Sequence, residues 1–318
     1  MVSRLRTLQA EWNALVPAAQ ARGIPRVRLL NLPLETIAYR ETKLNWLKAQ
    51  LQSTTASINS LSFGVELECL LPPNHTRETL AVLVREAGID CQAEAYNHTV
   101  RSGWKIVTDA SVGGGGSRGI ELVSPILVGE DGFNQLRKVC LALTAVQAKI
   151  TKTCGFHVHV DAREDSVDFF KNLVRLYASA EPVIDSFMAP SRRGSTNTFC
   201  QPVRISHDRM DLATTIDDVA YASGQMAGRH NYRNQSRYRK LNLQPYWQHG
   251  TVEFRQHQGT IDAQKADHWV RFCLRMVLAA RAGRTTGSSM DLLMQTVEAT
   301  QTEQEYFAGR AVYFQRRA

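Results

Sequence analysis

The sequence predicts an α+β protein, because strand and helix patterns mix along the chain without a regular βαβ rhythm. Residues 61–72, LSFGVELECLLP, alternate with a period of two, as in a half-buried strand. Residues 131–150 instead place their apolar side chains at the 3.6-residue spacing of an amphipathic helix. Both patterns recur along the chain, and no internal repeat groups them into units.

The remaining elements follow from the same two periods. We expect a short pair of strands around 91–110 and further strands at 119–124, 154–161, 237–243 and 251–257. We expect helices at 76–87, 165–188, 263–282 and over much of the tail after 285. Residues 1–58 are predicted as a helical extension with a second helix at about 38–52. The polar stretch 190–235 is predicted as a loop or lid, and Gly113–Gly116 as a hairpin tip or a flap at the mouth of a site.

Composition and charge limit the classes of function for this chain of 318 residues. It has no apolar run of about 18 residues and no apolar core of a secretory signal, so we expect no membrane span and a cytoplasmic protein. Six scattered cysteines without a CxxC pair predict reduced, buried thiols. The net charge of +8 is typical of nucleic-acid binding or of a site for polyanions such as ATP. Interleaved aromatic and basic residues are missing, so we do not expect nucleic acid as a partner.

Four of the predicted strands place ionisable side chains on one face. Successive side chains on a strand point to opposite faces, so the apolar residues of each strand define a core face. The opposite faces carry Glu66 and Glu68 in FGVELE, Glu121 in GIELVS, His157, His159 and Asp161 in GFHVHVD, and Glu253, Arg255 and His257 in TVEFRQH. If these strands share one sheet, the residues converge on a single surface.

Carboxylates and a histidine are suitable ligands for Mg²⁺ or Mn²⁺, and an adjacent arginine can hold a phosphate oxygen. Zinc is the rival metal, because HxH with carboxylates also occurs in metallohydrolases, although HExxH is absent. The residues alone leave three alternatives open. These are an enzyme of metal-assisted phosphate chemistry, a metal-dependent hydrolase that uses the same Glu/His cluster, and a nucleic-acid-binding protein without enzyme activity.

The ordered segments FGVELE, IELVSP, GFHVHVD and TVEFRQHQGT, with YRKLNL before the last, resemble the amidoligase family. These are COOH–NH₂ ligases of the glutamine synthetase and glutamate–cysteine ligase superfamily, and the resemblance spans about residues 60–280. It implies a glutamine synthetase-like fold, with helices packed on the back of a curved antiparallel sheet. It also implies that ATP phosphorylates a carboxylate, that an amine attacks the acyl phosphate, and that Mg²⁺ bridges the phosphates and the carboxylate. The partners would be small-molecule or peptide carboxylates and amines, and the basic charge favours anionic ones.

The resemblance also assigns roles by motif. It makes metal ligands of Glu66, Glu68, Glu121, His157 and Glu253. It places His159 near the nucleotide phosphates and Arg255 on the transferring phosphoryl group, so that Glu66, Glu253 and Arg255 form the catalytic centre. Arg239 and Asn242 match a substrate- or phosphate-binding motif, whereas Asp109 and Ser111 match a D-x-S element that faces the amino-acid or amine substrate. His257 is weighed between a role beside the ligands and that of a surface or core histidine. We divide the chain into a helical extension (1–58), a catalytic domain (59–285) and a C-terminal helical tail that packs on it (286–318).

Overall fold

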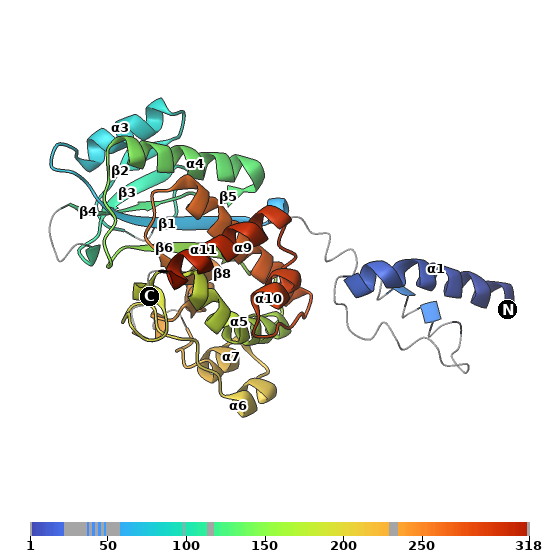
Figure 1. Cartoon of the computed structure of the whole chain (residues 1–318). Helices are drawn as coiled ribbons and strands as arrows, with labels where there is room; N and C mark the ends of the chain where they lie inside the picture. Colours follow the sequence, from blue (N-terminus) through green and yellow to red (C-terminus); the bar gives the residue numbers. More distant parts are fainter. Residues whose placement is uncertain are drawn as a thin grey trace.

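An eight-stranded sheet forms the centre of the protein in a computed structural model (Figure 1). The structure describes residues 2–21, 37, 40–41, 44–45, 48, 58–97, 99–112, 118–228 and 235–316. The strand order is β2-β3-β4-β1-β6-β8-β7, and β5 pairs with β1 beside this path. The bounds are β1 (Ser62–Leu70), β2 (Cys91–Ala93), β3 (Trp104–Thr108), β4 (Gly119–Val123), β5 (Leu127–Val128), β6 (Gly155–Asp161), β7 (Leu241–Asn242) and β8 (Thr251–Gln258). The β2–β3 pair is parallel and the other pairs are antiparallel, so the α+β prediction is confirmed.

The main helices lie close to their predicted positions. Their bounds are α3 (Arg77–Glu86), α4 (Gly129–Ala145), α5 (Val167–Phe187), α9 (Ala263–Arg281), α10 (Met290–Thr296) and α11 (Gln301–Gln315). Local caps begin several of them: the Thr76 side chain accepts from the Thr79 N–H, and the Asp262 side chain accepts from the Lys265 N–H. No helix among the described residues is long and apolar enough to cross a membrane.

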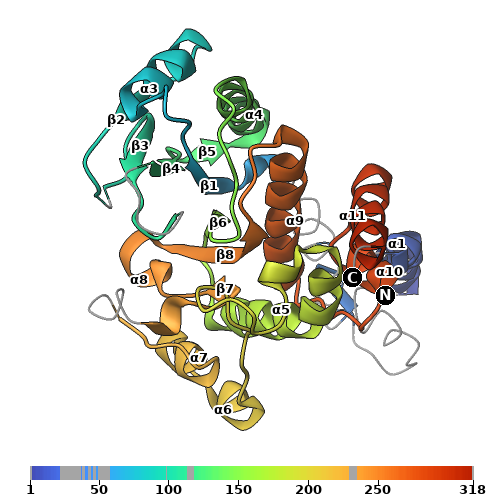
Figure 2. The same ribbon diagram turned by 60° about the vertical axis from the view of Figure 1, so that its left-hand side comes forward.

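The core lies between the apolar face of the sheet and helices α3, α4, α5 and α9 (Figure 2). Phe63, Val65 and Leu67 of β1 are each at most 2% exposed, as the alternation predicts. Across the layer, Phe63 contacts the Phe133 ring of α4 with the centroids 5.2 Å apart. Because this layer covers one face of the sheet, the ionisable face is left for a site.

The region predicted as a loop or lid at 190–235 contains two short helices, so that prediction is wrong for part of its length. They are α6 (His207–Leu212) and α7 (Ile216–Ala222). Helix α7 begins with a capping box, in which the side chains of Thr215 and Asp218 each accept from the other residue's backbone N–H. The segment between β7 and β8 also contains a helix, α8 (Pro245–His249). The predicted Gly113–Gly116 tip lies outside the described residues.

The ends of the chain are helical. Helix α1 (Val2–Ala21) buries Leu8 and Trp12, and its Arg4 and Glu11 pair with Glu41 and Lys48 at 2.7 Å each. The second predicted helix, 38–52, lies mostly outside the described residues, but residues 40, 41, 44, 45 and 48 are helical. At the other end, the Phe307 ring of α11 contacts Phe187 of α5 with the centroids 4.7 Å apart. The domain boundaries at 58 and 285 stay predictions.

Candidate functional site

Ten of the eleven predicted site residues line one cavity of about 670 Å³ on the open face of the sheet. They are Glu66, Glu68, Asp109, Ser111, Glu121, His157, His159, Asn242, Glu253 and Arg255. The eleventh, Arg239, does not line it: its Nη1 donates to the carbonyl of Pro202 at 3.4 Å. We call this space the first cavity.

Strand register brings these side chains together. Glu66 of β1 lies opposite His157 of β6, and His159 lies opposite Glu253 of β8. On the other side of β1, Glu68 lies opposite Glu121 of β4. A residue directly opposite in an antiparallel pair is within side-chain contact distance. The sheet therefore fixes the cluster through backbone pairing, before any ligand binds.

A β-bulge on β8 sets which of its side chains reach the cavity. The register against β6 shifts between Phe156 and Val158, so β8 carries an extra residue between Phe254 and His257. Glu253 before the bulge and Arg255 within it line the cavity. After it, His257 turns to the core, where its ring meets Trp269 with the centroids 5.4 Å apart. Burial lowers the pKa of His257 to about 3, so it is a neutral core histidine and not a cavity residue.

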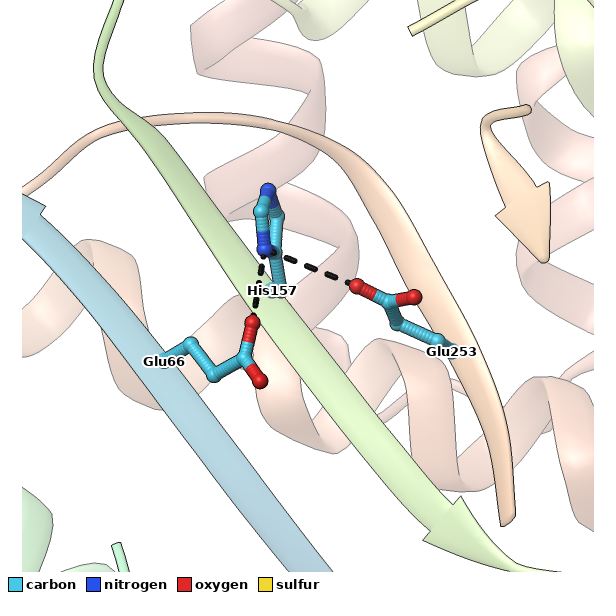
Figure 3. Close-up of side chains that lie close together, drawn as sticks. All are labelled: Glu66, His157 and Glu253. Carbon is cyan, nitrogen blue, oxygen red and sulfur yellow. Dashed lines mark hydrogen bonds and ion pairs between the residues drawn. The ribbon is translucent and has the colours of Figure 1, made fainter. Parts of the chain in front are cut away.

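Three strands contribute the first possible metal triplet, Glu66, His157 and Glu253 (Figure 3). His157 Nδ1 lies 3.0 Å from Glu66 Oε2 and 3.5 Å from Glu253 Oε1. Burial raises the pKa of Glu66, but hydrogen bonds from His157 and His159 outweigh it and hold the pKa well below its usual range. Burial also raises the pKa of Glu253, but the charge of Arg255 acts against it and the pKa is lowered. Both carboxylates are therefore ionised at neutral pH.

The second triplet, Glu68, Glu121 and His157, shares its histidine with the first. Burial raises the pKa of Glu121 well above its usual range, and the charges of Glu66, Glu68 and Asp109 raise it further. Like charges directly opposite each other in a sheet are destabilising. The backbone N–H of Gly155 donates to Glu68 Oε2 at 2.7 Å, which holds this carboxylate in place. A divalent cation would relieve the repulsion, because its charge favours the ionised carboxylates.

Arg255 and Asn242 hold Glu253 from the far side. Arg255 Nη1 donates to Glu253 Oε1 at 2.5 Å, and Asn242 Nδ2 donates to Glu253 Oε2 at 2.6 Å. Among the described residues, the buried Nε of Arg255 has no hydrogen-bond partner. A buried guanidinium with an unused donor is suited to an anionic ligand in the first cavity.

The predicted substrate residues Asp109 and Ser111 bond to each other on the cavity lining. Asp109 Oδ1 accepts from the backbone N–H and the hydroxyl of Ser111, at 2.8 and 2.6 Å. These bonds fix the turn that precedes the Gly113–Gly116 segment. Both residues line the first cavity, but neither contacts the metal triplets through a hydrogen bond or ion pair between described residues.

Sequence reasoning missed Gly155 and several lining side chains. A Cβ on Gly155 would lie 2.6 Å from His157 Nε2, so only glycine leaves room for this ring. Arg192 reaches the cavity from a 3₁₀ turn inside the predicted loop, and its Nη2 donates to the Cys154 carbonyl at 2.5 Å. The other missed lining side chains include Tyr96, Thr153, Phe199, Arg237 and Tyr238. Tyr238 opens the YRKLNL motif, which was the one available signal.

Comparison with known proteins places the chain in a family. Residues 59–277 match the family model described as "Putative amidoligase enzyme". The chain belongs to this amidoligase family. The match covers every strand of the sheet and both triplets, and a ligase function agrees with it. No curated protein matches.

A search of solved structures finds a bifunctional glutathione synthetase from Pasteurella multocida. The identity is 12% and the TM-score 0.46, over 84% of this amidoligase and 48% of that chain. The chain thus spans about half the length of that structure. The glutamine synthetase-like assignment of the fold stays a prediction.

Proposed function

We propose that this amidoligase forms an amide bond between a carboxylate and an amine at the expense of ATP, through an acyl phosphate. The observation that carries the proposal is the pair of metal-capable triplets sharing His157, with Arg255 beside them in one cavity. ATP and a carboxylate are both anions, so their reaction requires nearby positive charge.

The donor set is suited to Mg²⁺ or Mn²⁺. Four carboxylates and one imidazole form the two triplets, and oxygen donors predominate. Glu66 and Glu253 would hold one ion and Glu68 and Glu121 a second, and the one free lone pair of the neutral His157 imidazole would complete one of the two sites. Such ions neutralise phosphate charge and act as Lewis acids.

The proposed reaction has two steps. A carboxylate oxygen attacks the γ-phosphorus, a C–O–P linkage forms, and the P–O bond to ADP breaks. The amine nitrogen then attacks the acyl carbon, the C–N bond forms, the C–O bond to phosphate breaks, and the nitrogen loses a proton. In this scheme Arg255 balances charge on the phosphoryl group, while Asn242 keeps Glu253 oriented. His159, whose Nδ1 lies 3.1 Å from Thr251 Oγ1, would lie near the nucleotide phosphates in this scheme.

The first test is ATP turnover with Mg²⁺ over panels of carboxylates and amines, followed by phosphate release and by product mass. Turnover that requires both partners and gives an amide supports the ligase. Amide or ester hydrolysis in the absence of ATP would instead establish the metal-dependent hydrolase.

An isotope experiment tests the acyl phosphate itself. When the carboxylate carries ¹⁸O, one labelled oxygen leaves with the phosphate in the second step. Released phosphate with one ¹⁸O per turnover is the expected result. Unlabelled phosphate would mean that the carboxylate was not phosphorylated.

A further inference from the structure

A second cavity, of about 540 Å³, opens on the same face of the sheet. Glu66, Glu121 and His159 line both cavities, so residues of the predicted metal cluster form the wall between them. The second cavity extends from this wall over the start of β1, along residues 123–126, to α8 and Thr251. A ligand in it would therefore lie next to the reaction centre without occupying the first cavity.

The outer wall of the second cavity is apolar. Val100 and Ile126 are more than half exposed, at 55% and 57%, and Val123 lies beside them on the lining. Trp247 of α8 also lines this cavity. Two contacts hold it in place: its Nε1 donates to Asp217 Oδ1 at 3.0 Å, and its ring meets Tyr246 edge-on. A preformed aromatic and aliphatic wall is typical of a site for the carbon skeleton of a small ligand.

Gly64 leaves the space above β1 open. It lies in the row of β1 residues that also carries Glu66 and Glu68, and it pairs with His159. A Cβ added there would meet Ser124 Oγ at 3.6 Å and His159 Cβ at 3.9 Å, both ordinary contacts. The backbone at Gly64 is extended and the packing around it is not close, so neither requires glycine. The missing side chain therefore leaves free volume in the second cavity.

The charges on the lining favour an amine over an anion. The shared wall carries the carboxyl groups of Glu66 and Glu121, and it includes no Lys or Arg among the described residues. The described Lys and Arg side chains on the lining are already engaged. Lys105 is 3% exposed and donates to the carbonyl and side chain of Asn97 and the carbonyl of Thr99 at 2.8 to 2.9 Å. Arg163 Nε lies 3.4 Å from Asp161 Oδ1.

We propose that the second cavity binds the amine substrate and selects amines with an apolar or aromatic skeleton, and that Gly64 keeps its space open. The identity of the reaction rests on the proposed function, whereas the binding preference rests on the cavity alone. The skeleton packs against Trp247 and Ile126, and the nitrogen faces the shared wall. There it is adjacent to the acyl group formed in the first cavity.

Direct binding tests this proposal on the full chain without nucleotide or metal. The probes are 2-phenylethylamine and its carboxylate counterpart 3-phenylpropionate, titrated while the indole N–H signal of Trp247 is followed by NMR. We expect the amine to bind at least tenfold more tightly than the carboxylate and to shift this signal. Equal or tighter binding of the carboxylate would overturn the proposal.

Two matched variants test the role of Gly64. Gly64→Leu should weaken binding of 2-phenylethylamine at least tenfold, while Gly309→Leu, on α11 where an added Cβ meets nothing within 4 Å, should leave it unchanged. Amine binding that survives in Gly64→Leu would refute the assignment. If Gly64→Leu does not fold, the exposed Ile126→Lys takes its place. The added cation should weaken the amine probe and strengthen the carboxylate probe, and the reverse change contradicts the proposal.

The same panel separates failure of the cavity from failure of the ligase. Amine binding that depends on Gly64, in a protein without ATP turnover, supports the cavity and overturns the proposed function. ATP-dependent amide formation with an unchanged preference among amines in Gly64→Leu supports the proposed function and overturns the assignment of the second cavity.

Discussion

At the residue scale, Glu66 joins the two histidines of the cluster. It bonds His157 at 3.0 Å and approaches His159 at 3.4 Å, and it lines both cavities. Glu66→Gln keeps the size of the side chain and removes the charge that a metal ion requires. We expect ATP turnover to fall by about 10²-fold or more, in line with loss of one charged group in a preorganised site. Phosphate release at saturating Mg²⁺ measures it.

The control for Glu66→Gln is Glu164→Gln, because Glu164 is exposed. It should leave turnover unchanged, and circular dichroism should show the same fold for both variants. Full activity in Glu66→Gln would refute the metal-site interpretation.

Arg255 tests the phosphate part of the mechanism. Arg255→Lys keeps a positive charge but loses the planar fork that can bind two oxygens at once. We expect kcat to fall by about 10²-fold while the KM for ATP changes much less, because the interaction strengthens as charge develops. Steady-state kinetics separate the two constants, and a pure KM effect contradicts the assigned role.

The raised pKa of Glu121 predicts that its ionised carboxylate, which a metal ion requires, lowers the stability of the metal-free protein. Its folded pKa is raised above the unfolded value, so the stability that it contributes is present below the unfolded pKa and is lost as pH rises through the folded pKa. Glu121→Gln cannot ionise, so in EDTA it should be more stable than the wild type at pH 8 and equal to it near pH 4. Each pH unit between the two pKa values adds about 1.4 kcal/mol to the difference. Urea unfolding at several pH values measures it.

Magnesium should reduce the difference in stability between Glu121→Gln and the wild type, because an ion that binds only the folded state stabilises that state. The wild type, with its second triplet intact, should gain more stability from Mg²⁺ than Glu121→Gln does. Equal gains would remove Glu121 from the metal site.

At the element scale, strand parity predicted most of the site and failed where β8 bulges. Alternation placed Glu66, Glu68, Glu121, His157, His159 and Glu253 correctly, because their strands are regular through those positions. His257 lies past the extra residue, and a bulge leaves the apolar–polar pattern almost unchanged. Arg239 was assigned by its motif and not by alternation, and YRKLNL contributes only the two residues of β7 to the sheet.

Close tertiary contacts also give no signal in the sequence pattern. Gly155 is required by the ring of His157, and Arg192 comes from a turn far from the sheet strands in sequence. Helix α7 could have been predicted, because TIDD at residues 215–218 contains its capping box. The cavity around the cluster thus depends on tertiary packing that periodicity does not encode.

The bulge rests on a buried ionic network beneath the sheet. Lys240 is fully buried, and its Nζ contacts Glu181 at 2.9 Å and Asp185 at 2.7 Å. The Lys240 carbonyl accepts from the Arg255 N–H at 2.8 Å, and Gln256 Nε2 donates to Asp185 at 2.5 Å. Lys240 is therefore a structural lysine and not part of a solvated face.

Lys240→Met should destabilise the protein by about 3–5 kcal/mol, because it leaves the buried Glu181 and the partly buried Asp185 without their cation. Lys265→Met is the matched control, since its pair with Asp262 is about 40% exposed on each side and should contribute less than about 1 kcal/mol. Chemical denaturation measures both. A small loss in Lys240→Met would mean that the network is not held in the native state.

At the scale of the whole molecule, the helices after 285 are joined to the back of the catalytic layer. Arg275 of α9 pairs with Glu303 of α11 at 2.9 Å, and Arg284 pairs with Glu298 at 2.6 Å. The family match ends at residue 277, before these helices. Packing and ion pairs together indicate that the tail unfolds with the sheet rather than apart from it.

Phe307→Ala tests that cooperativity. Phe307 is 3% exposed and contacts Phe187 of α5 and Phe272 of α9. Removing the ring should cost about 3–5 kcal/mol and lower the melting temperature of the whole protein in one transition. Tyr313→Ala, at a 42% exposed position of the same helix, should have little effect. A second, earlier transition in Phe307→Ala, with the main one unmoved, would show that the tail is an independent unit and that the site does not depend on it.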